Sequence, residues 1–310
     1  MDEQQPLVID THVHPKMGAQ ALLAEMDSAG VQRAVLLAVD TDPADIRDPA
    51  RRRQTRFRFF QTPEARRVLW SEVETIMLQK LTPKVTNQVV AEMVAAHPER
   101  LIGLGSVNLG KDGAYVENKL DEIERLGLRG IKLLPFAQFF DPAESQNFLR
   151  ACAWCERTGS VILIHTGCGA PPWDAAAFSV DANPEKLRPA LERYHQVPII
   201  LAHLGSYSKD DPGIWFEEAL RLGADFPNVW GDLAAVAWLV EQEWRVERIR
   251  ETIGFKRILF ASDYPAVANQ VSIRYMIDLV RENPYLTDEE KLDILGRNAV
   301  RLFGEEDPHP

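Results

Sequence analysis

Four histidines and one aspartate of this 310-residue chain lie at or near the ends of predicted β-strands. His12 and His14 form a His-x-His pair in VIDTHVHP, and His165, His203 and Asp263 end later apolar runs. Side chains at positions i and i+2 of a strand point to the same face, so the pair can be directed at one point. Imidazole and carboxylate are good ligands for zinc and similar divalent metals. Three histidines and an aspartate, completed by a water molecule, would make an open, catalytic metal site.

Each of these residues has a simpler explanation when it is taken alone. A His-x-His on a strand is more often incidental, a single buried histidine is usually a hydrogen-bonded core residue, and an aspartate at a strand end usually caps the next helix. Their coincidence is the informative feature, because four of the seven histidines end predicted strands and an aspartate ends the last one. We therefore interpret the set as one site.

Eight short apolar runs can supply the strands that position these residues. They cover residues 6–14, 33–40, 100–109, 129–135, 160–167, 197–205, 228–234 and 257–265. Several are almost continuously apolar, which is typical of parallel strands covered by helices. Most intervening segments have helical character: residues 114–127 end at Gly127, and Asp141-Pro142 predicts the N-cap of a helix that ends near Gly159. The alternation predicts an α/β fold, a (β/α)8 TIM barrel over residues 1–310, with its active site at the C-terminal strand ends.

Residues 41–99 interrupt this regular alternation between the second and third strands. The segment is longer than one crossover helix requires, so we expect a helical insertion that acts as a lid. It contains six arginines between Arg47 and Arg58. One hypothesis is that an arginine such as Arg52 binds a substrate carboxylate in bidentate fashion. The simpler alternative, a solvated surface or a subunit contact, is favoured by the sequence.

The composition excludes several classes of function. A formal net charge of -11 argues against a broad nucleic-acid surface. No run approaches the ~18 apolar residues of a membrane span, and the acidic start MDEQQPLVID lacks the apolar core of a secretory signal. Three cysteines cannot form a complete disulfide framework, and the pair Cys152 and Cys155 falls inside a predicted helix, where we expect packing. We expect a cytoplasmic homo-oligomer that acts on a small molecule, with neither nucleic acid nor membrane as a partner.

Several motifs together resemble the amidohydrolase superfamily. VIDTHVHP resembles its opening motif, and GIKLLP, ILIHTG, ILAHLG and ILFASDYP resemble successive strand motifs of its amidohydrolase-related group. That group includes aminocarboxymuconate-semialdehyde decarboxylase, resorcylate-type decarboxylases and ring-cleavage hydrolases. The ending GRNAVRLFG resembles the terminal helix of the group. The resemblance spans almost the whole chain and is poor over residues 41–99.

The resemblance implies a role for each strand-end residue. His12, His14, His165 and Asp263 would bind the metal, which we expect to be one zinc ion, with manganese as a possible substitute. His203 would act beside the bound water as an acid/base or electrostatic catalyst, and Asp263 could also take a proton from that water. A divalent metal can lower the pKa of bound water to about 7, which yields hydroxide at neutral pH.

Lys132, on the fourth strand, leaves the number of metals open. In two-metal members of the superfamily a lysine at this place is carboxylated and bridges the ions, and the histidines of strands five and six hold the second ion. The closer motif resemblance is to the one-metal group, so we favour one metal. Lys132 could otherwise bind a substrate carboxylate or pair with a protein carboxylate, since an unpaired buried charge is costly. Trp173 could form a wall of the substrate pocket, and Asp232 could contact substrate or pair with Lys132.

Three functions are compatible with these residues. The first is a metal-dependent hydrolase, in which activated water attacks a carbonyl carbon of a small, carboxylate-bearing substrate. The second is a nonoxidative, metal-dependent decarboxylase of an aromatic or muconate-like acid. The third is a non-catalytic barrel that keeps a structural metal, which the intact set of ligands plus His203 argues against. Hydrolysis is favoured because it is the commoner chemistry of the superfamily.

Overall fold

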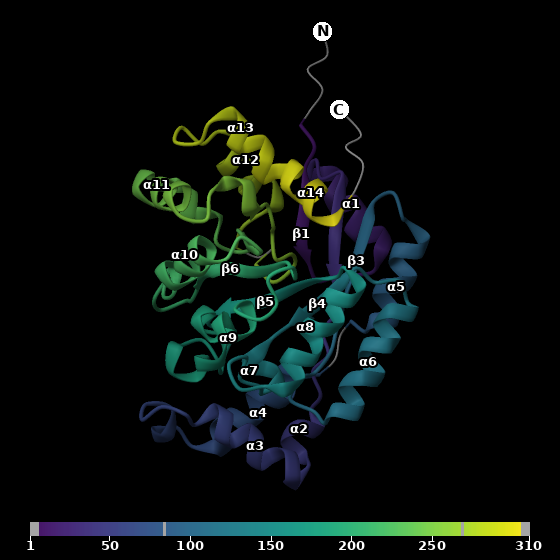
Figure 1. Ribbon diagram of the computed structural model, residues 1–310, viewed down its shortest axis with the longest axis vertical. Coiled ribbons are helices and arrows are strands. Elements are labelled where there is room, and N and C mark those ends of the chain that lie inside the picture. Colours follow the sequence, from purple (N-terminus) through teal and green to yellow (C-terminus); the bar gives the residue numbers. More distant parts are fainter. Residues whose placement is uncertain (1–5, 83–84, 268–269, 305–310) are drawn as a thin grey trace.

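A computed structural model describes residues 6–82, 85–267 and 270–304, and its eight strands form a single parallel sheet (Figure 1). The strands are β1 (Ile9–Val13), β2 (Arg33–Leu37), β3 (Leu101–Ser106), β4 (Gly130–Leu133), β5 (Val161–Gly167), β6 (Ile199–Tyr207), β7 (Val229–Asp232) and β8 (Ile258–Leu259). Each pairs with the next in chain order. A bridge between Val13 and Tyr264 and a 2.9 Å bond from Asp263 N to the His12 carbonyl oxygen join the end of β8 to β1. The predicted (β/α)8 TIM barrel is confirmed.

Helices connect and cover the strands. Outside the insertion they are α1 (Ala19–Ala29), α6 (Gly113–Arg125), α7 (Pro135–Gln138), α8 (Gln146–Thr158), α9 (Arg188–Leu191), α10 (Phe216–Asp225), α11 (Glu243–Glu251), α12 (Ile273–Arg281), α13 (Asp288–Leu292) and α14 (Asn298–Phe303). The amphipathic segment predicted at 114–127 is α6, which buries Val116, Leu120 and Ile123. None of the helices in the described ranges is both long and apolar enough to cross a membrane.

The start of α8 differs from the prediction, whereas its end agrees. The helix begins at Gln146, and Ser145 is its N-cap, because the Ser145 hydroxyl accepts a hydrogen bond from Phe148 N. The predicted cap at Asp141 is therefore wrong. The carboxylate of Asp141 accepts a hydrogen bond from Ala143 N at 3.0 Å, in a turn that precedes the helix, and it also pairs with Arg58 and Lys186. Gly159 ends the helix in the left-handed conformation, with φ of 67°, as a glycine readily does.

The barrel interior on the N-terminal side of the site is apolar. Alternate residues of a strand point to opposite faces of the sheet. On β2, Val35 and Leu37 therefore point into the barrel and join the interior cluster, whereas Ala34 and Leu36 point outward and pack with the surrounding helices. Phe303 of the terminal helix α14 belongs to the interior cluster as well. The polar site residues thus lie above a packed apolar layer, which supports them.

The described part of the long segment between β2 and β3 contains a short 3-10 helix (Ala65–Arg67) and four α-helices, α2 (Ala44–Arg47), α3 (Pro49–Phe59), α4 (Trp70–Lys80) and α5 (Asn87–Ala96). The last of them, α5, packs on β3, where a Cβ added to Gly103 would meet Val90 at 2.9 Å. It is therefore the ordinary crossover helix, and the true insertion comprises α2 to α4. These three helices gather beside α7 at one end of the molecule (Figure 1). They share a separate apolar cluster with α7 and Trp173.

Substitution of Gly130 by alanine tests how tightly β4 must approach β5. A Cβ at this position would lie 2.2 Å from the carbonyl oxygen of Val161, which is backbone and cannot rotate away. We expect Gly130→Ala to lower the free energy of unfolding by about 1–3 kcal/mol, the usual cost of an overpacked core. Denaturant unfolding followed by circular dichroism measures this loss.

Gly113→Ala is the matched control. The added Cβ would meet only the end of the Arg150 side chain, at 3.1 Å, and that side chain can move. Because alanine also favours the first turn of α6, we expect a change between zero and a gain of about 1 kcal/mol. Equal losses in both variants would contradict the assigned β4–β5 approach.

Candidate active site

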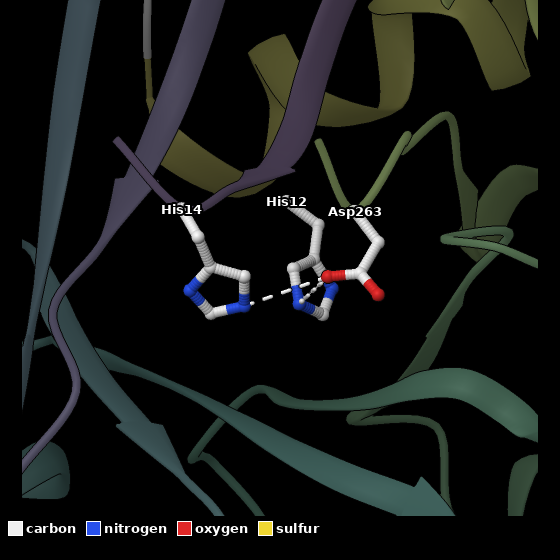
Figure 2. A group of neighbouring side chains, drawn as sticks. All are labelled: His12, His14 and Asp263. Carbon is white, nitrogen blue, oxygen red and sulfur yellow. Dashed lines mark ion pairs between the residues drawn. The ribbon is translucent and has the colours of Figure 1, made fainter. Parts of the chain in front are cut away.

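Three of the predicted metal-binding residues meet at the C-terminal mouth of the barrel. One ligand atom each from His12, His14 and Asp263 lies within 4.8 Å of the others. The Nε2 atoms of His12 and His14 lie 3.6 and 3.5 Å from Asp263 Oδ1, and Figure 2 shows both rings turned toward this carboxylate. The two histidines and Asp263 are some 250 residues apart in the sequence, and the closure of the barrel between β1 and the end of β8 brings them together.

Asp232 fixes the orientation of His12. Its Oδ2 lies 2.9 Å from His12 Nδ1, and both side chains are almost completely buried. A buried carboxylate beside Nδ1 favours the tautomer in which Nδ1 carries the proton, so the lone pair of Nε2 is directed into the cavity. Lys132 Nζ lies 3.2 Å from this Nε2.

His165 and His203 face each other across the same mouth. His165 Nε2 donates to the carbonyl oxygen of Cys168 at 2.8 Å, and His203 Nδ1 donates to that of Ala234 at 2.8 Å. Burial lowers the pKa of His203 to about 4 and that of His165 well below its usual range, so each ring holds one proton. The two inner nitrogens, 3.2 Å apart, are then both unprotonated acceptors.

This arrangement fits a cation. Within the described residues the buried Nδ1 of His14 has no hydrogen-bond partner. The inner nitrogens of His12, His165 and His203 present lone pairs to one space, and Asp263 supplies a carboxylate. Nitrogen and carboxylate donors suit zinc and other divalent transition metals. His165 lies outside the group of three atoms that approach within 4.8 Å, so the structure does not bring all four predicted ligands equally close.

Two groups of opposite charge are buried in the same mouth. Burial lowers the pKa of Lys132 to about 8, although Asp232 and Asp263 oppose that effect. Burial raises the pKa of Asp263 to about 7, and Lys132 partly counteracts it. Each group therefore stays closer to its neutral form than it would in water, which is a property of many catalytic residues.

The backbone around the site is strained and tied together. His203 and Asp263 have φ of 62° and 60°, a left-handed conformation that is unfavourable for residues other than glycine and that concentrates at functional sites. Hydrogen bonds to the buried side chain of Asp10 stabilise this geometry. Its carboxylate accepts bonds from His12 N at 3.2 Å, Ser262 N at 2.9 Å and Ser262 Oγ at 2.5 Å. One side chain thus links the β1 histidines to the segment that carries Asp263.

A cavity of about 330 Å³ opens above these groups. Its floor includes all four strand-end histidines, Asp263 and Lys132. Phe136 and Trp173 form an aromatic wall, with ring centroids 5.3 Å apart, and Leu81 and Val85 of the insertion region line it as well. The volume lies within the range of small-molecule sites, which begins near 300 Å³.

Two expected substrate contacts are placed elsewhere. Asp232 is completely buried and does not line the cavity: besides His12, it accepts hydrogen bonds from His203 N at 2.7 Å and Ala234 N at 3.1 Å. Arg52 pairs with Glu74 at 3.0 Å, stacks over Trp70, and is likewise not a lining residue. By contrast, Lys132 and Trp173 line the cavity as expected.

The lining residues that the sequence reasoning missed include Lys16, Lys80 and Tyr207. Lys16 follows His14 by two residues, so its place in the loop after β1 could have indicated it. Tyr207 ends β6 four residues after His203, with ring centroids 5.0 Å apart. Lys80 reaches the cavity only through the packing of the insertion, for which the sequence offers no local signal.

Comparison with known proteins agrees with the geometry. The sequence model of the amidohydrolase family matches residues 9–304. The chain belongs to the amidohydrolase family. A curated relative, 2-amino-3-carboxymuconate-6-semialdehyde decarboxylase of Dictyostelium discoideum, is 24% identical in an alignment that covers 70% of this chain and 65% of that protein. The match therefore spans slightly less than two thirds of the relative.

Two solved structures show the same fold as this amidohydrolase. 2,6-Dihydroxybenzoate decarboxylase from Rhizobium has a TM-score of 0.62 and 16% identity, over 97% of this chain and 99% of that one. A probable 2-pyrone-4,6-dicarboxylic acid hydrolase from Acinetobacter baumannii has a TM-score of 0.60 and 15% identity, over 96% and 99%. At such identities the likeness establishes the fold, and the reaction has to be argued from the site.

Replacement of Asp232 by asparagine tests the support of His12. If the asparagine oxygen accepts from His12 Nδ1, its NH₂ group faces the backbone N–H groups of His203 and Ala234. Both sides are then hydrogen-bond donors, so the two bonds that Asp232 accepts from these N–H groups are lost. We expect Asp232→Asn to weaken zinc binding about 10- to 100-fold, as is usual when a partner of a metal-binding histidine is lost. Competition with a chromophoric chelator measures the affinity.

Glu74→Gln serves as the control, because it makes the same chemical change at a carboxylate that pairs with Arg52 outside the cavity. Its zinc affinity should equal that of the unaltered protein. An unchanged affinity in a folded Asp232→Asn protein would show that the His12–Asp232 pair does not support a metal site.

Proposed function

We propose that this amidohydrolase is a metal-dependent, nonoxidative decarboxylase of a small aromatic or conjugated carboxylic acid. The observation that carries the proposal is the composition of one cavity: lone pairs of histidine, a carboxylate and a buried lysine on its floor, against an aromatic wall. The names of the decarboxylases among its relatives support this reaction over the hydrolysis favoured by the sequence.

The residues that would hold the metal are His12, His14 and Asp263, with His165 as the fourth ligand. When bound, a divalent ion such as zinc or manganese supplies positive charge that polarises substrate oxygens. His12 keeps the required tautomer through Asp232. Asp10 maintains the distance between the two strand ends that carry the ligands.

The remaining groups of the site position the acid and handle a proton. Phe136 and Trp173 present apolar faces, which can orient a flat ring and exclude water around it. Lys132 offers a positive charge beside the carboxylate that will leave. The bond from the ring carbon to this carboxylate breaks, carbon dioxide departs, and a proton takes its place on the carbon. The inner nitrogen of His203, an acceptor at rest, would take up a proton from solvent and pass it to that carbon, and Asp263 is the alternative carrier.

Hydrolysis is the second candidate. Asp263 and His203 could equally accept a proton from a water molecule that attacks a substrate carbonyl carbon. The fold of a probable 2-pyrone-4,6-dicarboxylic acid hydrolase is shared by the chain, which makes ring opening by water compatible with this architecture. Both reactions need the same floor residues, so they have to be distinguished by their products.

Product analysis separates the two reactions. Purified, zinc-loaded enzyme should release carbon dioxide from a hydroxybenzoate or muconate-type acid, and in D₂O the product should carry deuterium at the carbon that lost the carboxylate. Mass spectrometry in H₂¹⁸O is the complementary measurement. Incorporation of ¹⁸O without release of carbon dioxide would overturn the decarboxylase proposal in favour of hydrolysis.

The metal content tests the ligand assignment. We expect one equivalent of zinc or manganese per chain, loss of activity on chelation, and recovery on return of the metal. Intact-protein mass spectrometry and metal analysis together measure the ion and any carboxylation of Lys132. Two equivalents per chain with a carboxylated Lys132 would contradict the one-metal assignment and place the second ion between His165 and His203.

A further inference from the structure

The site cavity concentrates positive charge on an otherwise acidic protein. Three lysines, Lys16, Lys80 and Lys132, line it, whereas Asp263 is the only acidic lining residue in the part of the chain that the structure describes. The whole chain, by contrast, has a formal net charge of -11. A cavity of this kind attracts anions.

The three lysines lie at different depths in the cavity. Lys132 is completely buried on the floor, next to His12. Lys16 and Lys80 are exposed. Lys16 lies in the loop after β1, and Lys80 is the last residue of α4, in the connection between β2 and β3. Because β1 and β2 are neighbours in the sheet, both lysines belong to connections that leave adjacent strands. The floor charge can therefore serve the reacting group, and the two outer charges lie on the solvent side of the same space.

Three arginines of the insertion are already engaged by protein carboxylates. Arg51 pairs with Asp45 at 3.0 Å, Arg52 with Glu74 at 3.0 Å, and Arg58 with Asp141 at 3.2 Å. Lys80 differs from them, because it lines the cavity and has no ion pair to a described residue. The anion-binding role that the sequence suggested for an arginine is thus better filled by this lysine.

We propose that Lys80, together with Lys16, binds a second acidic group of the substrate, remote from the carboxylate that reacts at the floor. The substrate class is then a dicarboxylic acid of about one ring in size, because a cavity of about 330 Å³ holds little more. This inference rests on the proposed function, since it assumes that an acid occupies the site. It makes the insertion the element that selects the substrate.

Equilibrium binding tests the inference without turnover. Benzoate and isophthalate share one ring and differ by one carboxylate, and their affinities for the zinc-loaded protein are measured by calorimetry. We expect isophthalate to bind at least about tenfold more tightly, the usual worth of one charge-assisted contact. Lys80→Gln should remove most of this preference and leave benzoate binding unchanged, whereas Lys80→Arg should retain it. Lys16→Gln should reduce it as well.

Arg53→Gln is the matched control, because it removes one positive charge from the exposed surface of the same insertion, away from the lining residues. It should leave both affinities unchanged. A preference for isophthalate that survives in the Lys16→Gln, Lys80→Gln double variant would overturn the inference, as would the absence of any preference in the unaltered protein. Release of carbon dioxide in the product assay would in either case leave the proposed reaction standing.

Discussion

The hydrogen bonds of Asp232 hold the site together. One oxygen of this buried carboxylate faces His12 of β1, and the other accepts the backbone N–H groups of His203, on β6, and Ala234. A single group on β7 therefore sets the proton position on one histidine and the main-chain position of another. A carboxylate can do this because it accepts bonds at both oxygens and donates none when ionised. The other features of the mouth depend on this anchor.

The anchor has a consequence for the electrostatics of the mouth. His12, His165 and His203 each donate outward, to Asp232, to Cys168 and to Ala234, so all three present acceptors inward. Because burial keeps the rings neutral, the interior contains several lone pairs, of which that of His12 faces Lys132 Nζ at 3.2 Å. The inner nitrogens of His165 and His203 face each other as two acceptors, an arrangement that a cation satisfies well. The strained backbone conformation of His203 and Asp263 persists because these outward hydrogen bonds, and those that Asp10 accepts from His12 N and Ser262 N, hold the surrounding main chain in place.

The barrel and part of the site could be predicted from the sequence. Apolar runs determine strands locally, and the TIM topology then brings their C-terminal ends together, which is why His12, His14 and Asp263 could be grouped. The partners of Asp232 and Arg52 could not be predicted, since each depends on which side chain lies nearby in three dimensions. The start of α8 was mistaken because Asp141 caps only a short turn, through Ala143 N, whereas Ser145 caps the helix itself. Lys80 has no local signature at all.

The insertion has an apolar cluster of its own, in which Phe59, Trp70 and Met77 pack with Phe136 and Trp173. The rest of the barrel is organised around other clusters. Exposed positions on the cavity side of α4, such as Lys80, belong to none of these clusters, so changes there can accumulate without disturbing the packing that aligns the strand-end histidines. In evolutionary terms, the residues that carry out the reaction can be conserved while the residues that select the substrate change. A lineage with this architecture can drift from one acid to another by mutation in a single stretch of chain.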